Sequence, residues 1–165
     1  MTKKIAQRGL FLALALILAY VESLIPFSFG IPGIKLGLPN LIVVMLLYQG
    51  SAKEAFLINI LRIILSGFLF SSLYAILYAL AGAVLSFAAM LIARRMCCFS
   101  IIGVSVLGGV FHNIGQIIVA ILVVNTVYVG YYVPGLIVAG TVTGSVLGII
   151  AMELIPYVVR LSEHG

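Results

Sequence analysis

Residues 101–124 read IIGVSVLGGVFHNIGQIIVAILVV, a run that contains no Asp, Glu, Lys or Arg. An α-helix needs roughly 20 predominantly apolar residues to cross the ~30 Å hydrocarbon core of a bilayer. This run is long enough to do so, and its larger polar side chains (His112, Asn113 and Gln116) are one imidazole and two uncharged amides. The stretch therefore predicts a transmembrane helix, and it decides the class of the fold.

The rest of the chain has the same character. Over 165 residues, 64% are hydrophobic and 8% are charged, and the mean hydropathy is +1.35. Ordinary soluble domains are roughly 45–50% apolar and about 25% charged. The excess of apolar residues is too large for one buried core, so the composition excludes a soluble enzyme, a nucleic-acid-binding module and a disordered segment. We expect an integral membrane protein that contacts the lipid bilayer and no nucleic acid.

Proline, glycine and short polar clusters divide the chain into six predicted transmembrane helices. Residues 27–33, FSFGIPG, form a loop after the first of them. Residues 22–26, ESLIP, offer no small-residue cleavage site, so we interpret the first helix as retained and not as a signal peptide. We therefore expect an all-α bundle that forms a single membrane domain over 1–165, with helices at about 10–26, 36–48, 55–70, 73–93, 101–124 and 132–157.

The distribution of basic residues predicts the orientation of this bundle. Cytoplasmic loops carry an excess of Lys and Arg. With the N-terminus inside, the outer side holds only Lys35, and Arg62 lies within a helix. Both termini are therefore expected in the cytoplasm, together with the remaining basic residues: Lys3, Lys4, Arg8, Lys53, Arg94, Arg95 and Arg160.

Arg62 lies near the middle of the predicted third helix. A central arginine costs at least ~2.5–3.5 kcal/mol on membrane-insertion scales, so its side chain should face protein or water and have a partner. One interpretation is a contact with an anion or carbonyl group of a ligand. The other is a fixed ion pair, or hydrogen bonds to carbonyl groups, that holds helices together. Glu22 is the candidate partner, or it reaches the outer interface.

The densest polar cluster is formed by His112, Asn113 and Gln116. The i, i+4 spacing places His112 and Gln116 on one helix face, with Asn113 beside them. Hydrocarbon offers these groups no hydrogen bonds, so a ligand, a buried water or another helix must supply them. Lining of a ligand site and contact between helices both remain open. A metal site is the least expected interpretation, because no carboxylate or thiolate side chain lies beside His112 in this cluster to act as a second metal ligand.

Three further side chains are candidates for contact with a ligand. Tyr74 and Tyr78 are one turn apart in the predicted fourth helix, where they either pack between helices or stack on a flat ligand. Asn40, at the start of the predicted second helix, either caps that helix or touches ligand.

Features of known catalytic sites are missing from the sequence. It shows no nucleophile–base pair, no phosphate-binding loop and no carboxylate pair. A prenyl-diphosphate synthase would need Asp-rich motifs to hold magnesium, and this chain contains no Asp. The adjacent Cys97 and Cys98 form no CxxC motif, and we expect a reduced pair at a helix end. We expect no enzymatic activity, no cofactor and no bound metal.

Small residues recur every fourth position on two predicted helices. They are Ala15, Ala19 and Ser23 on the first, and Gly140, Gly144 and Gly148 on the last. Such faces let helix backbones approach closely inside a membrane. The glycine face is expected to pack within the bundle. The alanine face either packs internally or presents a docking surface to another membrane protein.

Several of these segments together resemble a known family. Residues 31–40, IPGIKLGLPN, Arg62 with Ser66 and Gly67, residues 74–86, and residues 111–116, FHNIGQ, resemble the Gx transporter family, also labelled heptaprenyl diphosphate synthase component I. The resemblance covers nearly the whole chain. More remotely, the chain is similar to the substrate-binding S components of energy-coupling-factor transporters, whose first helix carries an AxxxA motif; Ala15 and Ala19 occupy the matching place.

The resemblance implies a multi-pass protein of the bacterial cytoplasmic membrane that binds a small vitamin-like or cofactor-precursor molecule. Ala15 and Ala19 would dock on a transmembrane coupling subunit, and partner ATPase subunits would power transport. The ligand would lie towards the outer side, against residues 27–35 including Lys35, and against Tyr74, Tyr78, His112, Asn113 and Gln116. The synthase label leaves a second hypothesis open, a non-transporting membrane subunit linked to isoprenoid or quinone metabolism or to flavin-linked electron transfer.

Overall fold

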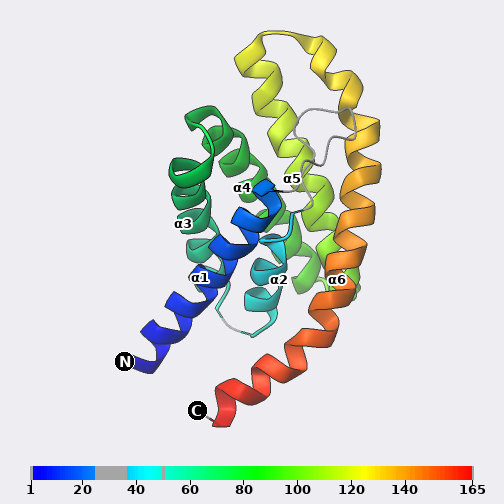
Figure 1. Cartoon of the computed structure of the whole chain (residues 1–165). Helices are drawn as coiled ribbons and strands as arrows, with labels where there is room; N and C mark the ends of the chain where they lie inside the picture. The colour runs from blue at the N-terminus through cyan, green and yellow to red at the C-terminus, as the bar shows by residue number, and fades with distance from the viewer. Residues whose placement is uncertain (1, 25–36, 50, 165) are drawn as a thin grey trace.

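The computed structural model describes residues 2–24, 37–49 and 51–164 of the chain, and over these ranges the fold is all-α, as predicted. Figure 1 shows the helices gathered into one bundle, with both chain ends at the same end of it. In chain order the elements are α1 (Thr2–Leu24), α2 (Asn40–Gln49), α3 (Ala52–Phe70), α4 (Leu73–Arg95), α5 (Ile101–Val124), the short 3-10 helix η1 (Val127–Tyr132) and α6 (Val133–His164).

Serine side chains begin three of these helices. Ser51, Ser72 and Ser100 precede α3, α4 and α5, and each accepts a hydrogen bond from a backbone N–H of the first turn. This satisfies donors that the helix itself leaves unpaired. Residues with positive φ follow two helix ends, since Cys97 has φ 53° after α4 and Asn125 has φ 51° after α5. Local sequence therefore sets these helix boundaries.

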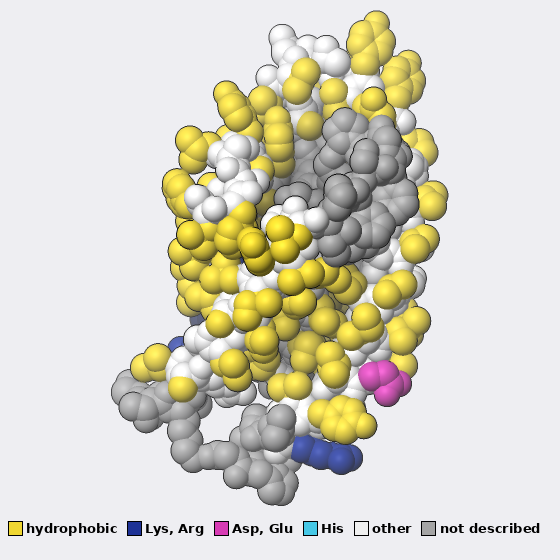
Figure 2. All heavy atoms as spheres, viewed as in Figure 1, with side chains coloured by type: hydrophobic (Ala, Val, Ile, Leu, Met, Phe, Trp, Pro, Cys, Tyr) yellow, Lys and Arg dark blue, Asp and Glu magenta, His cyan; other side chains and the backbone are white. Residues whose placement is uncertain are grey.

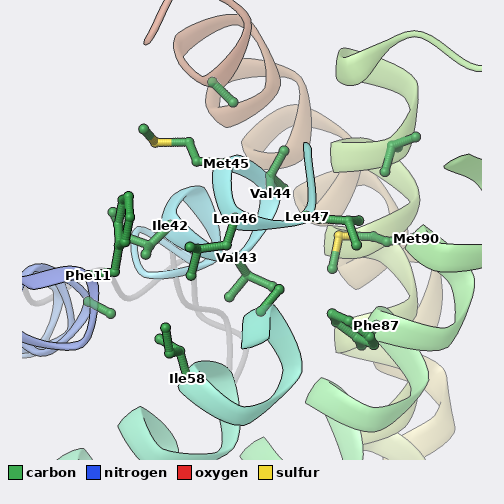
Figure 3. Close-up of a cluster of buried hydrophobic side chains, with 14 of the residues drawn as sticks. Phe11, Ile42, Val43, Val44, Met45, Leu46, Leu47, Ile58, Phe87 and Met90 are labelled. Carbon is green, nitrogen blue, oxygen red and sulfur yellow. The ribbon is translucent and has the colours of Figure 1, made fainter. Parts of the chain in front are cut away.

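The short helix α2 lies at the centre of the core. Six consecutive residues, Ile42–Leu47, are buried, so this helix is apolar and covered on all its faces. Figure 3 shows the side chains of α2 surrounded by Phe11 of α1, Ile58 of α3, and Phe87 and Met90 of α4. The core is therefore built around a helix that is itself too short to cross a membrane.

The most extensive helix contacts join α4 to α5 and α5 to α6. The glycine face of α6 lies on α5: a Cβ atom added at Gly144 would lie 2.7 Å from Val106 Cα, and one added at Gly148 would lie 2.7 Å from Ile102 Cα. On α5, a Cβ at Gly109 would meet the backbone of Gly140 at 2.6 Å. The prediction that the glycine face packs within the bundle is confirmed, because the backbones meet where side chains are missing.

Within residues 2–24, 37–49 and 51–164, four helical segments are long and apolar enough to cross a membrane: Ile5–Leu24, Leu73–Arg95, Ile101–Val124 and Val127–Arg160. Six predicted spans are therefore supported only in part. The helix α2 has 10 residues, which gives a length of about 15 Å. The helix α3 contains Lys53, Glu54 and Arg62. Figure 2 shows apolar side chains over most of the visible face, as expected for a surface in contact with lipid.

Charged side chains gather at the end of the bundle that holds the termini. Arg8 of α1 forms an ion pair with Glu54 at the start of α3. The guanidinium of Arg94, in the last turn of α4, lies 5.4 Å from the ring centroid of Tyr48. Successive helices from α1 to α6 run in opposite directions along the bundle, and this brings the basic residues predicted to be cytoplasmic to one end of it (Figure 1). The side of the membrane on which this end lies stays a prediction.

Candidate functional site

A partly open cavity of about 120 Å³ lies in the half of the bundle farther from the chain termini. Its walls come from the last turns of α1, the start of α2, the second half of α3, the first turns of α4, the middle of α5 and the first half of α6. Both polar and apolar side chains line it. The described lining residues are Ala19, Glu22, Ser23, Gly37, Asn40, Arg62, Ile63, Ser66, Gly67, Phe70, Ser71, Ala75, Ile76, Ala79, Gly109, His112, Asn113, Gln116, Thr143, Gly144 and Leu147.

Arg62 is the one Lys or Arg residue among the described residues of the cavity wall. Its side chain is half-buried, and its Nε donates a hydrogen bond to Asn59 Oδ1 at 3.0 Å. Asn59 is 2% exposed and lies one turn earlier on α3, so the core holds the acceptor in place. The structure therefore gives Arg62 a fixed anchor through Nε and places the residue in the cavity wall.

Glu22, in the last turn of α1, lines the same cavity. Its Oε1 accepts a hydrogen bond from the backbone N–H of Gly37, which has φ 72°. Glu22 and Arg62 carry opposite charges in the same wall, and among the described residues no hydrogen bond joins their side chains. The described wall thus carries opposite charges, on Glu22 and on Arg62.

The polar cluster of α5 faces the cavity as a group. His112, Asn113 and Gln116 all line it. Asn113 is also 8% exposed and donates a hydrogen bond from Nδ2 to the carbonyl oxygen of Leu136 at 2.8 Å, so its amide joins α5 to α6. The ring of His112 packs against Gly82 of α4, where an added Cβ would lie 2.9 Å from ring atoms. Asn113 therefore lines the cavity and also joins two helices, and contact with a ligand stays a prediction.

The structure brings five of the eight predicted ligand-binding residues to the cavity: Asn40, Arg62, His112, Asn113 and Gln116. Their role in binding a ligand stays a prediction. Lys35 and residues 27–35 lie outside the described residues. Tyr74 and Tyr78 are absent from the described lining, and Tyr74 is 64% exposed. Ala75 and Ala79 occupy the face of α4 that lines the cavity, and contact of the two tyrosines with a ligand stays a prediction.

The alanine face of α1 turns into the bundle. Ala15 is 0% exposed within the core cluster, and Ala19 and Ser23 line the cavity. The structure favours the internal interpretation of this face. Ala15 is covered by other parts of the chain, whereas Ala19 is only half-buried, and docking of a partner subunit on Ala15 and Ala19 stays a prediction.

Other residues of the site have weaker signals in the sequence. Asn59 and Ser66 lie three residues before and four after Arg62, so they share its helix face. Ser66 lines the cavity and donates its hydroxyl to the carbonyl oxygen of Ile63 at 3.2 Å. Their helical spacing from a central arginine is the signal that would have identified them. Among the described residues, no three His, Cys, Asp or Glu side chains come together as a metal site.

Comparison with known proteins gives one match. A family model described as heptaprenyl diphosphate synthase component I matches residues 11–154, a range that contains every described residue of the cavity wall. No curated protein and no solved structure matches the chain.

Proposed function

The chain belongs to the heptaprenyl diphosphate synthase component I family, and we propose that it is a membrane-embedded subunit that binds a small molecule in the cavity at Arg62. We propose further that it works like the S component of an energy-coupling-factor transporter. The ligand would be a vitamin-like or cofactor-precursor molecule. A transmembrane coupling subunit and ATPase subunits would complete the transporter, since the family is named as one component of a larger system.

The observation that carries this proposal is a polar cavity inside an apolar bundle. Polar and ionisable groups within a membrane are expensive, and they typically mark a substrate or ion pathway. Arg62, Glu22, His112 and Gln116 gather around one space of about 120 Å³, although each could have been placed at the water interface at lower cost. A bundle that needed only structural contacts would leave no such space between its polar side chains.

The position of the cavity supports capture from the outer side. It lies in the half of the bundle away from the termini, and the excess of Lys and Arg at the other end favours a cytoplasmic location for that end. The chain shows no phosphate-binding loop, so the energy for release to the inside would come from partner subunits.

A second candidate function follows from the name of the family. A non-transporting membrane subunit associated with heptaprenyl diphosphate synthesis would also need a polar site, but its ligand would enter from the lipid. The two candidates therefore differ in the side from which the cavity is reached.

Cysteine labelling distinguishes these routes. Cys97 and Cys98 are first changed to Ser, and Ser66→Cys then places a thiol in the cavity wall. The transporter proposal predicts that the small, membrane-impermeant reagent MTSES labels this thiol when added to the outside of right-side-out vesicles. Ala88→Cys, on the exposed face of α4, is the matched control, and it should stay unlabelled because it faces lipid. Equal lack of labelling at both positions would contradict the proposal.

A further inference from the structure

We infer that the ligand of this cavity carries a single carboxylate, which Arg62 binds, on a body about the size of one six-membered ring. This inference rests on the proposed function and specifies its substrate class.

The hydrogen-bond donors of Arg62 point to an acidic ligand. A guanidinium has five N–H donors in a fixed, fork-like geometry. Nε donates to Asn59, and neither terminal nitrogen has a hydrogen-bond partner in the described part of the chain. Four donors on a side chain that lines the cavity are therefore left for a ligand or water. Two parallel N–H bonds from such a fork match the two oxygens of a carboxylate.

Asn59 acts as a positioning residue for this fork. It is 2% exposed, and the 3.0 Å bond to Nε restricts the guanidinium from the side of the core. A preorganised fork loses less side-chain freedom when it binds, which strengthens the contact with the ligand. The hydroxyl of Ser66 donates to the carbonyl oxygen of Ile63, and among the described residues no hydrogen bond joins Ser66 to Arg62.

Glu22 limits the charge that the ligand can carry. Its carboxylate belongs to the same wall as Arg62. The carboxylate of Glu22 adds negative charge to the described wall, and it repels every negative charge that a ligand brings, so a ligand with fewer negative charges is favoured at Arg62. A phosphate monoester carries about −1.5 to −2 at pH 7, so the cavity should favour a carboxylate over phosphate and, more strongly, over diphosphate.

The size and the walls of the cavity define the rest of the ligand. An apolar cavity of ~150 Å³ holds a benzene molecule, and this one has about 120 Å³. Part of the wall is apolar, formed by the side chains of Ile63, Ile76, Ala79 and Leu147. These side chains have no hydrogen-bonding groups. A single aromatic or aliphatic ring with one acidic group therefore matches both the volume and the chemistry of the space.

Matched probes test this inference on the purified full-length chain in detergent. Benzoate and benzamide have nearly the same shape, but only benzoate is an anion. We expect benzoate to raise the midpoint of thermal unfolding and benzamide to raise it less, with dissociation constants at least tenfold apart in isothermal titration. Inorganic phosphate and pyrophosphate should bind more weakly than benzoate. Equal binding of benzoate and benzamide, tighter binding of pyrophosphate, or no binding of benzoate would overturn the inference.

Variants of Arg62 add a second test. Arg62→Gln should remove the preference for benzoate over benzamide, whereas Arg62→Lys should keep the charge and part of the preference. Arg95→Gln, an exposed arginine at the far end of α4, is the control and should bind both probes like the wild type. The comparison of the two probes on the wild type stands even where a variant fails to fold. A neutral molecule found bound in the cavity of the native protein would overturn the carboxylate inference and leave the proposed function intact.

Discussion

Replacing Gly148 by Ala tests the close contact between α5 and α6. A Cβ atom at this position would lie 2.7 Å from Ile102 Cα and 3.0 Å from Ser105 Cβ. Ile102 Cα belongs to the backbone, so no side-chain rotation can relieve the contact, and the two helices must move apart. Gly148 is not among the described residues of the cavity wall, so the change examines the fold without touching the candidate site.

The expected cost can be worked out from this geometry. Separating packed surfaces by about 0.5–1 Å forfeits a quarter to a half of the dispersion energy of each contact, and inserting a methyl group into a well-packed interior typically costs about 1–3 kcal/mol. Alanine also gains about 0.8–1.0 kcal/mol over glycine in helix propensity. Gly9→Ala measures that gain alone, because a Cβ at Gly9 would meet nothing within 4 Å.

The assay is reversible unfolding by SDS in mixed micelles, followed by far-ultraviolet circular dichroism. Relative to Gly9→Ala, Gly148→Ala should lower the free energy of unfolding by about 1–3 kcal/mol, or roughly 5- to 150-fold in the equilibrium constant. Equal free energies for the two variants would show that the backbones of α5 and α6 are not in contact at Gly148, and would refute the packing described for this pair of helices.

Three further predictions use the same assay. Leu47→Ala, at a fully buried position of α2, should cost about 2–5 kcal/mol, and a loss below 1 kcal/mol would contradict the central place of α2. Asn113→Leu removes the 2.8 Å bond to the Leu136 carbonyl and should cost about 0.6 kcal/mol, the average for hydrogen bonds between helices in a membrane protein, and no more than about 1.7 kcal/mol; an unchanged free energy would argue against that bond. Glu54→Gln breaks the exposed ion pair with Arg8, so it should cost no more than about 1 kcal/mol, with a smaller effect at high salt, and a salt-independent loss would contradict its surface location.

Much of the fold could be predicted because its signals are local. The charge-free run 101–124 coincides with α5, Ile101–Val124, and the predicted helix 73–93 lies within α4, Leu73–Arg95. Serine caps and apolar length act within a few residues, so they can be recognised without knowledge of the rest of the structure. The close packing of the glycine face of α6 was predictable for the same reason, because the spacing itself defines one helix face.

The arrangement of the helices depends on contacts between distant segments, and the sequence left it open. The helix α2 has an apolar run, LIVVMLL at 41–47, that shows no preferred face; this pattern fits a helix buried on all sides, but it does not say which neighbours cover it. Likewise, Ala15 was compatible with an inner or an outer surface, and the structure places it in the core.

In the candidate site, too, some residues could be predicted from local sequence, whereas the position of others depends on packing between helices. Arg62 and the His112–Gln116 cluster were found because polar groups in an apolar segment are costly and therefore informative. Tyr74 and Tyr78 give no such signal, because an aromatic side chain is stable both in a protein core and at a membrane interface. Their position outside the described cavity wall depends on the rotation of α4 about its own axis, which is set by packing against α3 and α5.

Native mass spectrometry of the protein purified from its own membrane tests the central claim, that the cavity holds a small molecule, most directly. The account predicts a bound mass in the wild type that is lost in Ala79→Phe, which fills the cavity from α4, and kept in Ala88→Phe, which adds the same ring on the exposed face of that helix. A bound mass that survives in both variants, or no bound mass in the wild type, would contradict it.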